Sequence, residues 1–176
     1  MKEKKLTSIS ARIESEIKEI MDAESELNHT SFNAMLNKIL RRHVEWDRFT
    51  QEIGMIYVNK SALRSILAKL DERDIKLIAS STCRSGLRDA VIFLKKEMSF
   101  KSVIETIDLW LSASGIPYRH SSTDNGEKYI IQHDLSAKYS IYLQTSIAAL
   151  FSEIQYGLTD ISASDHNLIF KVIQIK

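Results

Sequence analysis

The stretch KKLTSISARIESEIKEI, residues 4–20, changes its hydrophobic period partway along. Between Thr7 and Ile13 every second residue is apolar or small, and the residues between them are polar. Alternation with a period of two is typical of a β-strand that buries one face. After Ile13 the apolar residues recur at helical spacing as far as Leu27, and acidic residues occupy the first turn. The sequence therefore predicts a short strand followed directly by an amphipathic helix.

A second helix is predicted after a short turn. Asn28 is suited to the left-handed residue that often follows a helix end, and Thr30 and Ser31 are good N-caps. From Phe32 to Val44 the apolar residues again follow helical spacing. We therefore expect two helices joined by a tight turn, the second of which runs on towards residue 53.

A lone strand leaves its backbone donors and acceptors unpaired, and these groups need partners. The shortest solution is antiparallel pairing with the same strand of a second copy of the chain. The apolar side of such a ribbon would lie on the helices of both copies. Its other side would present Ser8, Ser10 and Arg12 to solvent. The alternative is that the strand forms the edge of a sheet built by the later part of the chain.

The segments SISARIESEI and NHTSFNAMLNKIL resemble the ribbon-helix-helix family of DNA-binding proteins over about residues 4–48. The family more often has glycine at the position of Asn28 and proline at that of Glu14. The resemblance implies an intersubunit two-stranded antiparallel ribbon, with two helices per chain, that enters the major groove of double-stranded DNA. Matching positions imply that Ser8, Ser10 and Arg12 contact base edges. The residues implied at phosphates are Lys4, Lys5, Thr30, Ser31 and Phe32.

The amino-acid composition limits the classes of protein to which the chain can belong. The chain has 176 residues, of which 44% are hydrophobic and 27% charged, and these values favour a globular protein with a real core. No apolar run approaches the roughly 18 residues that span a bilayer. No secretory signal is recognisable, and a single cysteine forms no internal disulfide, so we expect a cytoplasmic protein. The net charge is only +1, but lysines cluster before residue 6 and acids follow Ile13.

The sequence predicts an N-terminal domain over residues 1–53. The remaining two thirds of the sequence, residues 54–176, predict a separate, helix-rich α+β domain. We expect a short strand at 56–58, helices within 60–73, 73–97 and 99–114, a hairpin of 118–122 and 127–133 around the turn TDNG, and a helix from 134 or 136 to about 157. The final segment, NLIFKVIQIK, is apolar on both faces and is expected to be a central strand of a small antiparallel sheet.

Residues capable of catalysis or metal binding form no recognised motif. There is no glycine-rich phosphate loop and no helical histidine pair, so we predict neither an enzyme nor a cofactor. Cys83 lies on the apolar side of its helix and is interpreted as a buried structural thiol. A metal site from His120, His133 and His166 is the weaker interpretation, because the spacing is not that of a ligand motif. Four tyrosines, Tyr118, Tyr129, Tyr139 and Tyr142, either line a small-ligand pocket or fill the edge of the core.

The sequence thus favours a homodimeric, sequence-specific DNA-binding transcriptional regulator, whose second domain assembles subunits into a higher oligomer or senses a signal. One alternative is an antitoxin whose C-terminal part binds a toxin, although such tails are commonly short and poorly ordered. Another is a repressor that responds to a metal or a small ligand. No membrane partner is expected.

Overall fold

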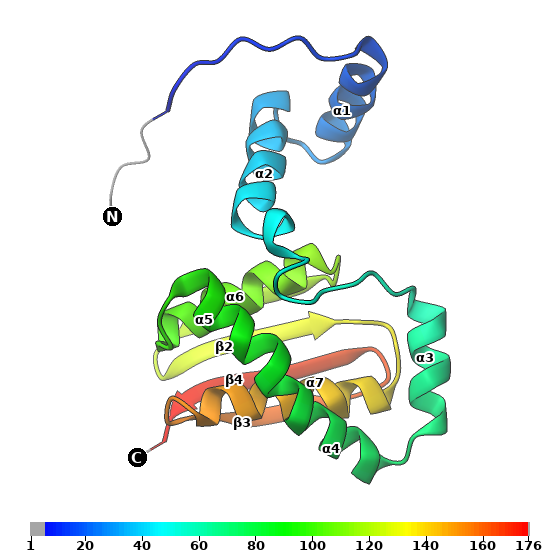
Figure 1. The fold of residues 1–176 in the computed structure, drawn as a ribbon, viewed down its shortest axis with the longest axis vertical. Coiled ribbons are helices and arrows are strands. Elements are labelled where there is room, and N and C mark those ends of the chain that lie inside the picture. The colour runs from blue at the N-terminus through cyan, green and yellow to red at the C-terminus, as the bar shows by residue number, and fades with distance from the viewer. Residues whose placement is uncertain (1–5, 176) are drawn as a thin grey trace. The chain divides into compact units, whose positions relative to one another are not determined.

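The computed structural model describes residues 6–175 and shows an α+β chain with its strands in the C-terminal half (Figure 1). The chain divides into two compact units, Met1–Arg41 and Arg42–Lys176. This division falls earlier than the boundary at 53 and 54 that the sequence suggested. No described helix is long and apolar enough to cross a membrane.

The predicted strand over residues 7–13 is wrong. Residues 6–14 belong to no strand or helix, and the first regular element is α1, Ser15–Leu27. All described strands lie between Tyr118 and Gln174 and pair with one another. The intersubunit ribbon-helix-helix fold that the alternation suggested is therefore not supported. Alternation over seven residues is a weak signal, because a strand forms only where a partner satisfies its backbone.

The two N-terminal helices form as predicted, except that the second ends at Glu45 and does not run on towards residue 53. At the end of α1 the left-handed residue is His29, with φ 49°, rather than Asn28, whose φ is −91°. The amide of Thr30 donates to the carbonyl of Ser25, which closes the turn. The second helix, α2, is Phe32–Glu45, and Ser31 Oγ accepts from the amide of Ala34 at 3.2 Å. Ser31 is thus the cap that the sequence indicated.

The second unit begins with a 3-10 turn and an extended segment, followed by a series of helices. Residues 56–58, which we expected to form a short strand, have no regular structure. The elements are η1 Asp47–Phe49, α3 Lys60–Lys69, α4 Glu72–Cys83, the π-helical turn η2 Arg84–Arg88, α5 Asp89–Lys95 and α6 Phe100–Ala113. Asn59 and Ser99 cap α3 and α6 by accepting from the amides of Ala62 and Ser102.

The sheet follows α6 and has four antiparallel strands in the order β1-β2-β4-β3. The bounds are β1 Tyr118–Thr123, β2 Gly126–Gln132, α7 Ala137–Ser152, β3 Tyr156–Ala163 and β4 Asn167–Gln174. The predicted hairpin and the central position of the last strand are confirmed. The strand β3 was missed, because its residues were assigned to the end of a helix and a loop.

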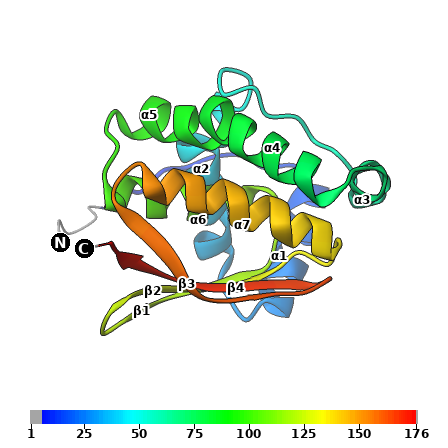
Figure 2. The same ribbon diagram turned by 90° about the horizontal axis from the view of Figure 1, so that it is seen from below.

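Helices α4, α6 and α7 lie on one side of the sheet (Figure 2). Alternate residues of the strands point into this layer and form the core with the helices. Its largest fully buried side chains are Tyr129, Phe151, Phe170, Ile75, Ile107, Leu111, Ile131, Leu143, Ile147, Leu150, Leu168 and His133. At roughly 1.5–3 kcal/mol for each fully buried large apolar side chain, this layer dominates the stability of the second unit.

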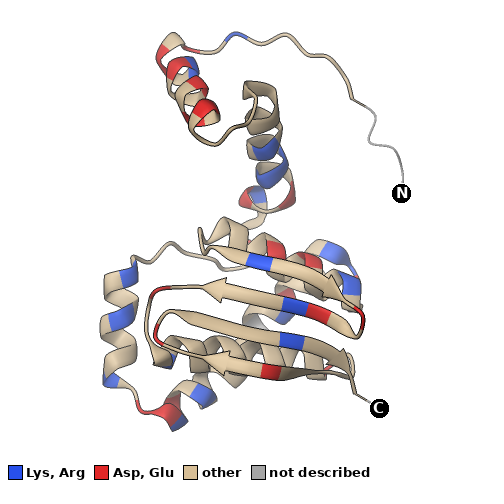
Figure 3. Cartoon of the chain, turned by 180° about the vertical axis from the view of Figure 1, so that it is seen from behind, with Lys and Arg blue, Asp and Glu red and all other residues tan. Residues whose placement is uncertain are grey.

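The opposite face of the sheet is covered by none of the unit's described helices, and basic residues lie on it (Figure 3). Lys128 and Lys171 are partners across β2 and β4, and Arg119 pairs in register with Ile130 in the next row. No described acid forms an ion pair with these three side chains. Like charges directly opposite each other in a sheet are destabilising. The pairing of Lys128 with Lys171 therefore slightly lowers the stability of the sheet.

Candidate functional site

The N-terminal candidates are partly outside the described chain. Lys4 and Lys5 lie outside residues 6–175. Ser8, Ser10 and Arg12 lie in the segment without regular structure, and all three are exposed. The structure brings none of them into a hydrogen bond or ion pair with another described residue. Their side chains are therefore accessible to a partner, but within a single chain they do not lie on a strand.

The start of α2 places the remaining candidates together. Thr30 and Ser31 are exposed, and Phe32 is half-buried beneath the ammonium of Lys18, which lies 4.9 Å from its ring centroid. The amides of Phe32 and the next residue, in the first turn, have no described acceptor. Free amides at a helix N-terminus, together with the helix dipole, attract anions such as phosphate.

Apolar side chains of both N-terminal helices remain exposed in the single chain. Ile17 and Ile20 on α1 are 46% and 55% exposed, and Ile39 and Leu40 on α2 are 48% and 46% exposed. Within the unit, α1 and α2 contact each other through Ser25, which is buried and bonds to the sulfur of Met35. The unit therefore leaves unburied much of the apolar surface that its helical periodicity would normally place in a core.

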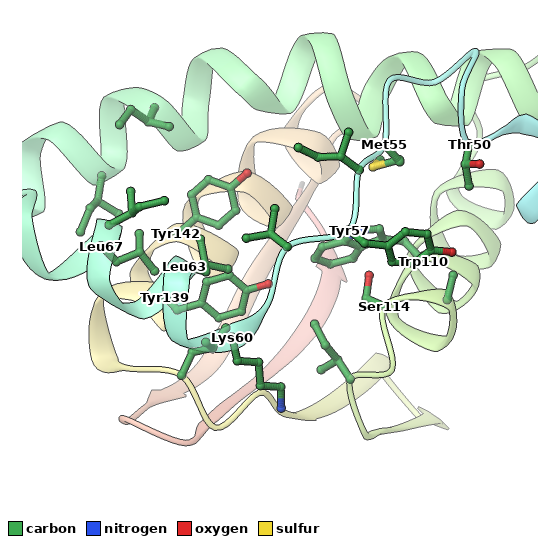
Figure 4. Close-up of a pocket in the computed structure, with 18 of the residues that line it drawn as sticks. Thr50, Met55, Tyr57, Lys60, Leu63, Leu67, Trp110, Ser114, Tyr139 and Tyr142 are labelled. Carbon is green, nitrogen blue, oxygen red and sulfur yellow. The ribbon is translucent and has the colours of Figure 1, made fainter.

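The second unit contains a cavity of about 490 Å³ between the extended segment 55–58, helices α3, α4 and α6, and the first half of α7 (Figure 4). This size is typical of small-molecule sites in proteins. Most of its walls are aliphatic or aromatic. The lining residues drawn and labelled are Thr50, Met55, Tyr57, Lys60, Leu63, Leu67, Trp110, Ser114, Tyr139 and Tyr142.

Two walls of the cavity are fixed by polar contacts from distant parts of the chain. The guanidinium of Arg64 on α3 donates to the carbonyls of Leu135 and Asp134, at 2.9 and 2.7 Å. The ammonium of Lys138 on α7 donates to the carbonyls of Ala68 and Leu70, at 3.0 and 2.6 Å. The bonds from Lys138 satisfy carbonyls at the end of α3, which have no partner within the helix. Both sets of bonds hold α3 against the start of α7.

The segment that crosses the cavity is exposed on its outer side. Ile56 is 83% exposed and Tyr57 is 86% exposed, although both also line the cavity. The segment starts after Gly54, whose φ of +69° favours glycine, and ends at the helix cap Asn59. Few of its contacts are buried, so it belongs to the less stable part of this unit.

Few polar groups line the cavity, and some of them form hydrogen bonds within the protein whereas others do not. Tyr142 shares a hydrogen bond with Thr82 at 3.3 Å. Tyr139 is only 6% exposed, and its burial raises the pKa of the phenol, but its hydroxyl bonds to no described residue. Trp46 is only 3% exposed, and its indole N–H likewise has no described acceptor. No fully buried side-chain nitrogen or oxygen of the described chain lacks a partner, so these two groups face open space, and both line the cavity.

The four tyrosines singled out in the sequence are divided between two places. Tyr139 and Tyr142 line the cavity. Tyr129 is buried and donates to Asp108 Oδ1 at 2.9 Å, and Tyr118 donates to the Asp108 carbonyl at 3.2 Å. Burial, followed by the negative charge of Asp108, raises the pKa of both of these phenols. The pocket and core-edge interpretations therefore each hold for one pair.

A second polar cluster surrounds His120. Its two ring nitrogens lie 3.0 Å from Asp108 Oδ2 and 3.0 Å from Glu127 Oε2, and its ring stacks on that of Tyr129 at 4.3 Å. These two carboxylates are its hydrogen-bond partners among residues 6–175, and no hydroxyl or thiol bonds to it. The arrangement joins α6 to the β1–β2 hairpin, and the hydroxyl of Ser122 donates to the other oxygen of Glu127 at 3.1 Å.

The other candidates from the sequence lie apart from one another. His133 is buried and bonds to Ser140 Oγ at 2.7 Å, whereas His166 is exposed and lies 3.4 Å from Asp134. His120, His133 and His166 do not gather, and residues 6–175 contain no group of three or more metal-ligating side chains suited to an ion. Cys83 is buried and its Sγ donates to the Ser146 carbonyl at 3.2 Å, which confirms the structural thiol.

Most of the residues that line the cavity were not predicted from the sequence to lie together. Trp46 and Trp110 are far apart in the sequence and were not considered together, and the apolar run at 55–58 was assigned to a strand. Comparison with known protein families, with curated proteins and with solved structures finds no match for this chain.

Proposed function

We propose that this chain is a DNA-binding transcriptional regulator that acts as a homodimer and contacts DNA through its first unit. The observation that carries the proposal is that residues 6–41 expose two kinds of group that a partner would cover. One is the basic and polar set Ser8, Ser10 and Arg12, and the other is the apolar surface of α1 and α2.

The groups suited to DNA differ in what they can recognise. Arg12 is the only cation among described residues 6–14, and an arginine can bond in bidentate fashion to a guanine edge in the major groove. The free amides at the start of α2 suit a phosphate, which positions a protein without reading sequence. Together they provide one specific and one positioning contact per chain, and two copies would double both.

The alternatives are less well supported by the same features. A toxin-neutralising segment is commonly short and poorly ordered, whereas the second unit of this chain has a hydrophobic core of its own. A ligand-responsive regulator is compatible with the proposal, because DNA binding and the cavity concern different units of the chain.

Arg12→Ala should weaken binding to a cognate DNA site by about 1–3 kcal/mol, which is roughly 5- to 150-fold, because the bidentate base contact is lost. The cognate site would first be selected from a random pool with the full chain, and affinity measured by fluorescence anisotropy at several salt concentrations. Arg73→Ala is the matched control, since it removes the same exposed charge from α4 in the second unit. Equal losses for the two variants, or equal wild-type affinity for selected and random DNA, would contradict the proposal.

Ile39→Asp should convert the dimer to a monomer, because it places a charge in the apolar surface that a second copy would bury. Analytical ultracentrifugation of the full chain over a concentration series measures this directly. Leu77→Asp is the control, because Leu77 is an exposed leucine, 60% accessible, on α4 of the other unit. We expect the Leu77 variant to remain dimeric. A wild-type chain that stays monomeric at all concentrations would overturn this part of the proposal.

A further inference from the structure

The cavity of the second unit has the properties of a binding site for a particular class of ligand. It is large enough for a small organic molecule, and its walls are mainly Leu, Ile, Trp and Tyr side chains. An apolar chain that enters it buries apolar surface of both ligand and wall, and this burial is favourable. The ligand must therefore be largely apolar.

The charge of the residues that line the cavity restricts the class of ligand that it can bind. Lys60 is the one charged residue in the cavity wall described here, and neither aspartate nor glutamate lines it. Lys60 is exposed and forms no described ion pair, so its ammonium stays hydrated at the edge while its stem contacts the interior. This arrangement favours a ligand with a negative charge at one end and disfavours a cation.

The unpaired polar groups indicate where the charged end lies. Lys60 lies one helical turn before Arg64, which donates to the carbonyls of Asp134 and Leu135 just ahead of α7. Tyr139 lies in the first turn of α7. Lys60 and Tyr139 therefore line the same end of the cavity (Figure 4), and the hydroxyl of Tyr139 has no partner among described residues. A carboxylate oxygen placed there would accept a hydrogen bond from this hydroxyl, and a hydrogen bond to a charged group is stronger than one between neutral groups.

We propose that this cavity binds an amphipathic monocarboxylate, with the carboxylate between the Lys60 ammonium and the Tyr139 hydroxyl and the apolar chain directed towards Trp110. The inference goes beyond DNA binding and does not depend on it. The segment 55–58 lines one side of the cavity, and it is the expected entrance because Ile56, Tyr57 and Val58 are more than half exposed.

The protein provides its own probe for this site. The chain has two tryptophans, Trp46 and Trp110, and both line the cavity. Intrinsic tryptophan fluorescence of the full chain therefore reports occupancy without a label. The ligands tested are decanoate, decanol and decylammonium, all kept below their aggregation concentrations. We expect saturable binding of decanoate, weaker binding of decanol and no saturable change with decylammonium.

Two variants separate the two polar contacts. Lys60→Gln should weaken decanoate binding by about two- to fivefold and leave decanol unchanged, because a solvent-exposed ion pair contributes little. Tyr139→Phe should weaken decanoate binding about tenfold, since a hydrogen bond to a charged group is lost. The fold tolerates this change, because the hydroxyl bonds to no described residue. Lys69→Gln on the same helix α3 is the control and should leave both affinities unchanged.

Three results would overturn the inference. The first is the absence of saturable fluorescence change with decanoate and decanol, which would show that the cavity binds neither. The second is equal affinity for decanoate, decanol and decylammonium, which would indicate partitioning into apolar surface rather than recognition. The third is equal decanoate affinity in wild type, Lys60→Gln and Tyr139→Phe. Each of these is measured without DNA, so it leaves the proposed function untouched.

Discussion

Gly126→Ala is expected to destabilise the protein by about 3 kcal/mol or more, the largest effect predicted for a single methyl group in this chain. Gly126 opens β2 with φ +146°, a conformation that residues with a side chain rarely adopt. A Cβ placed there would lie 1.9 Å from the backbone oxygen of Val172 on β4. The backbone on both strands would have to move, since neither the φ angle nor the carbonyl can be relieved by a side-chain rotation.

The matched control is the same substitution at a helical position. Gly86 lies in the π-helical turn between α4 and α5, and a Cβ there would meet nothing within 4 Å. Gly86→Ala should therefore stabilise the protein by about 0.5–1 kcal/mol, since alanine loses less conformational entropy than glycine on folding. Urea unfolding of the two variants and the wild type measures both effects. Equal stability of Gly126→Ala and wild type would show that the close approach of β2 to β4 is wrong.

The second large effect concerns His133 and pH. Its side chain is fully buried, and its Nδ1 accepts from the amide of Leu135, so the neutral ring carries its proton on Nε2 and donates to Ser140. The Ser140 hydroxyl in turn donates a hydrogen bond to the carbonyl of Ser164 at 2.6 Å. Burial, with a smaller contribution from the charges of His166 and Lys60, lowers the pKa of His133 from 6.5 to about 4, against opposing carboxylates.

This lowered pKa makes stability fall as the solution is acidified. Between pH 6.5 and about 4 the unfolded chain holds a proton on this imidazole and the folded chain does not. The unfolded state therefore binds more protons, and the free energy of unfolding decreases with falling pH. The contribution is fully present above pH 6.5 and is lost on approach to pH 4. Its size is up to about 3 kcal/mol.

Comparison with a variant isolates this contribution from the many carboxylates that titrate in the same range. His133→Gln should be less stable than wild type at pH 7, because the bonds to Ser140 and Leu135 are disturbed. The difference should shrink by up to about 3 kcal/mol between pH 7 and pH 4, since only the wild type loses the His133 contribution. His43→Gln is the control for replacing a histidine, because His43 lies at an exposed position on α2 and its side chain forms no described hydrogen bond, so its loss should change the stability at pH 7 little. A constant difference for His133→Gln would contradict the prediction.

Local signals in the sequence predicted much of the second unit. Caps were readable because a serine accepts a hydrogen bond from an amide only a few residues away, as at Ser99 and Ser136. The turn TDNG and the helix stop at Gly115, whose φ is +63°, likewise depend on neighbouring residues alone. These interactions are completed within one turn or one hairpin, so the order of residues suffices to specify them.

Strand formation at 7–13 and at 156–163 could not be judged in the same way. The first segment alternates well but finds no partner in its own chain, whereas the second alternates poorly and pairs with β4 through a register shift between Thr159 and Ser162. A strand is stable only when another strand satisfies its backbone groups, and that partner is remote in sequence. Pattern alone therefore overestimated the first segment and missed the second.

The sequence by itself determined the two N-terminal helices, the caps, the hairpin and the apolar final strand, because each depends on period or on contacts between near neighbours. The tertiary structure decided the rest. It placed Trp46 and Trp110 around one cavity, left the Tyr139 hydroxyl facing it, and enclosed His133 beside Ser140. Which groups meet and which lose water depends on the packing of segments far apart in the chain, and that packing is a sum over many small contacts rather than a local pattern.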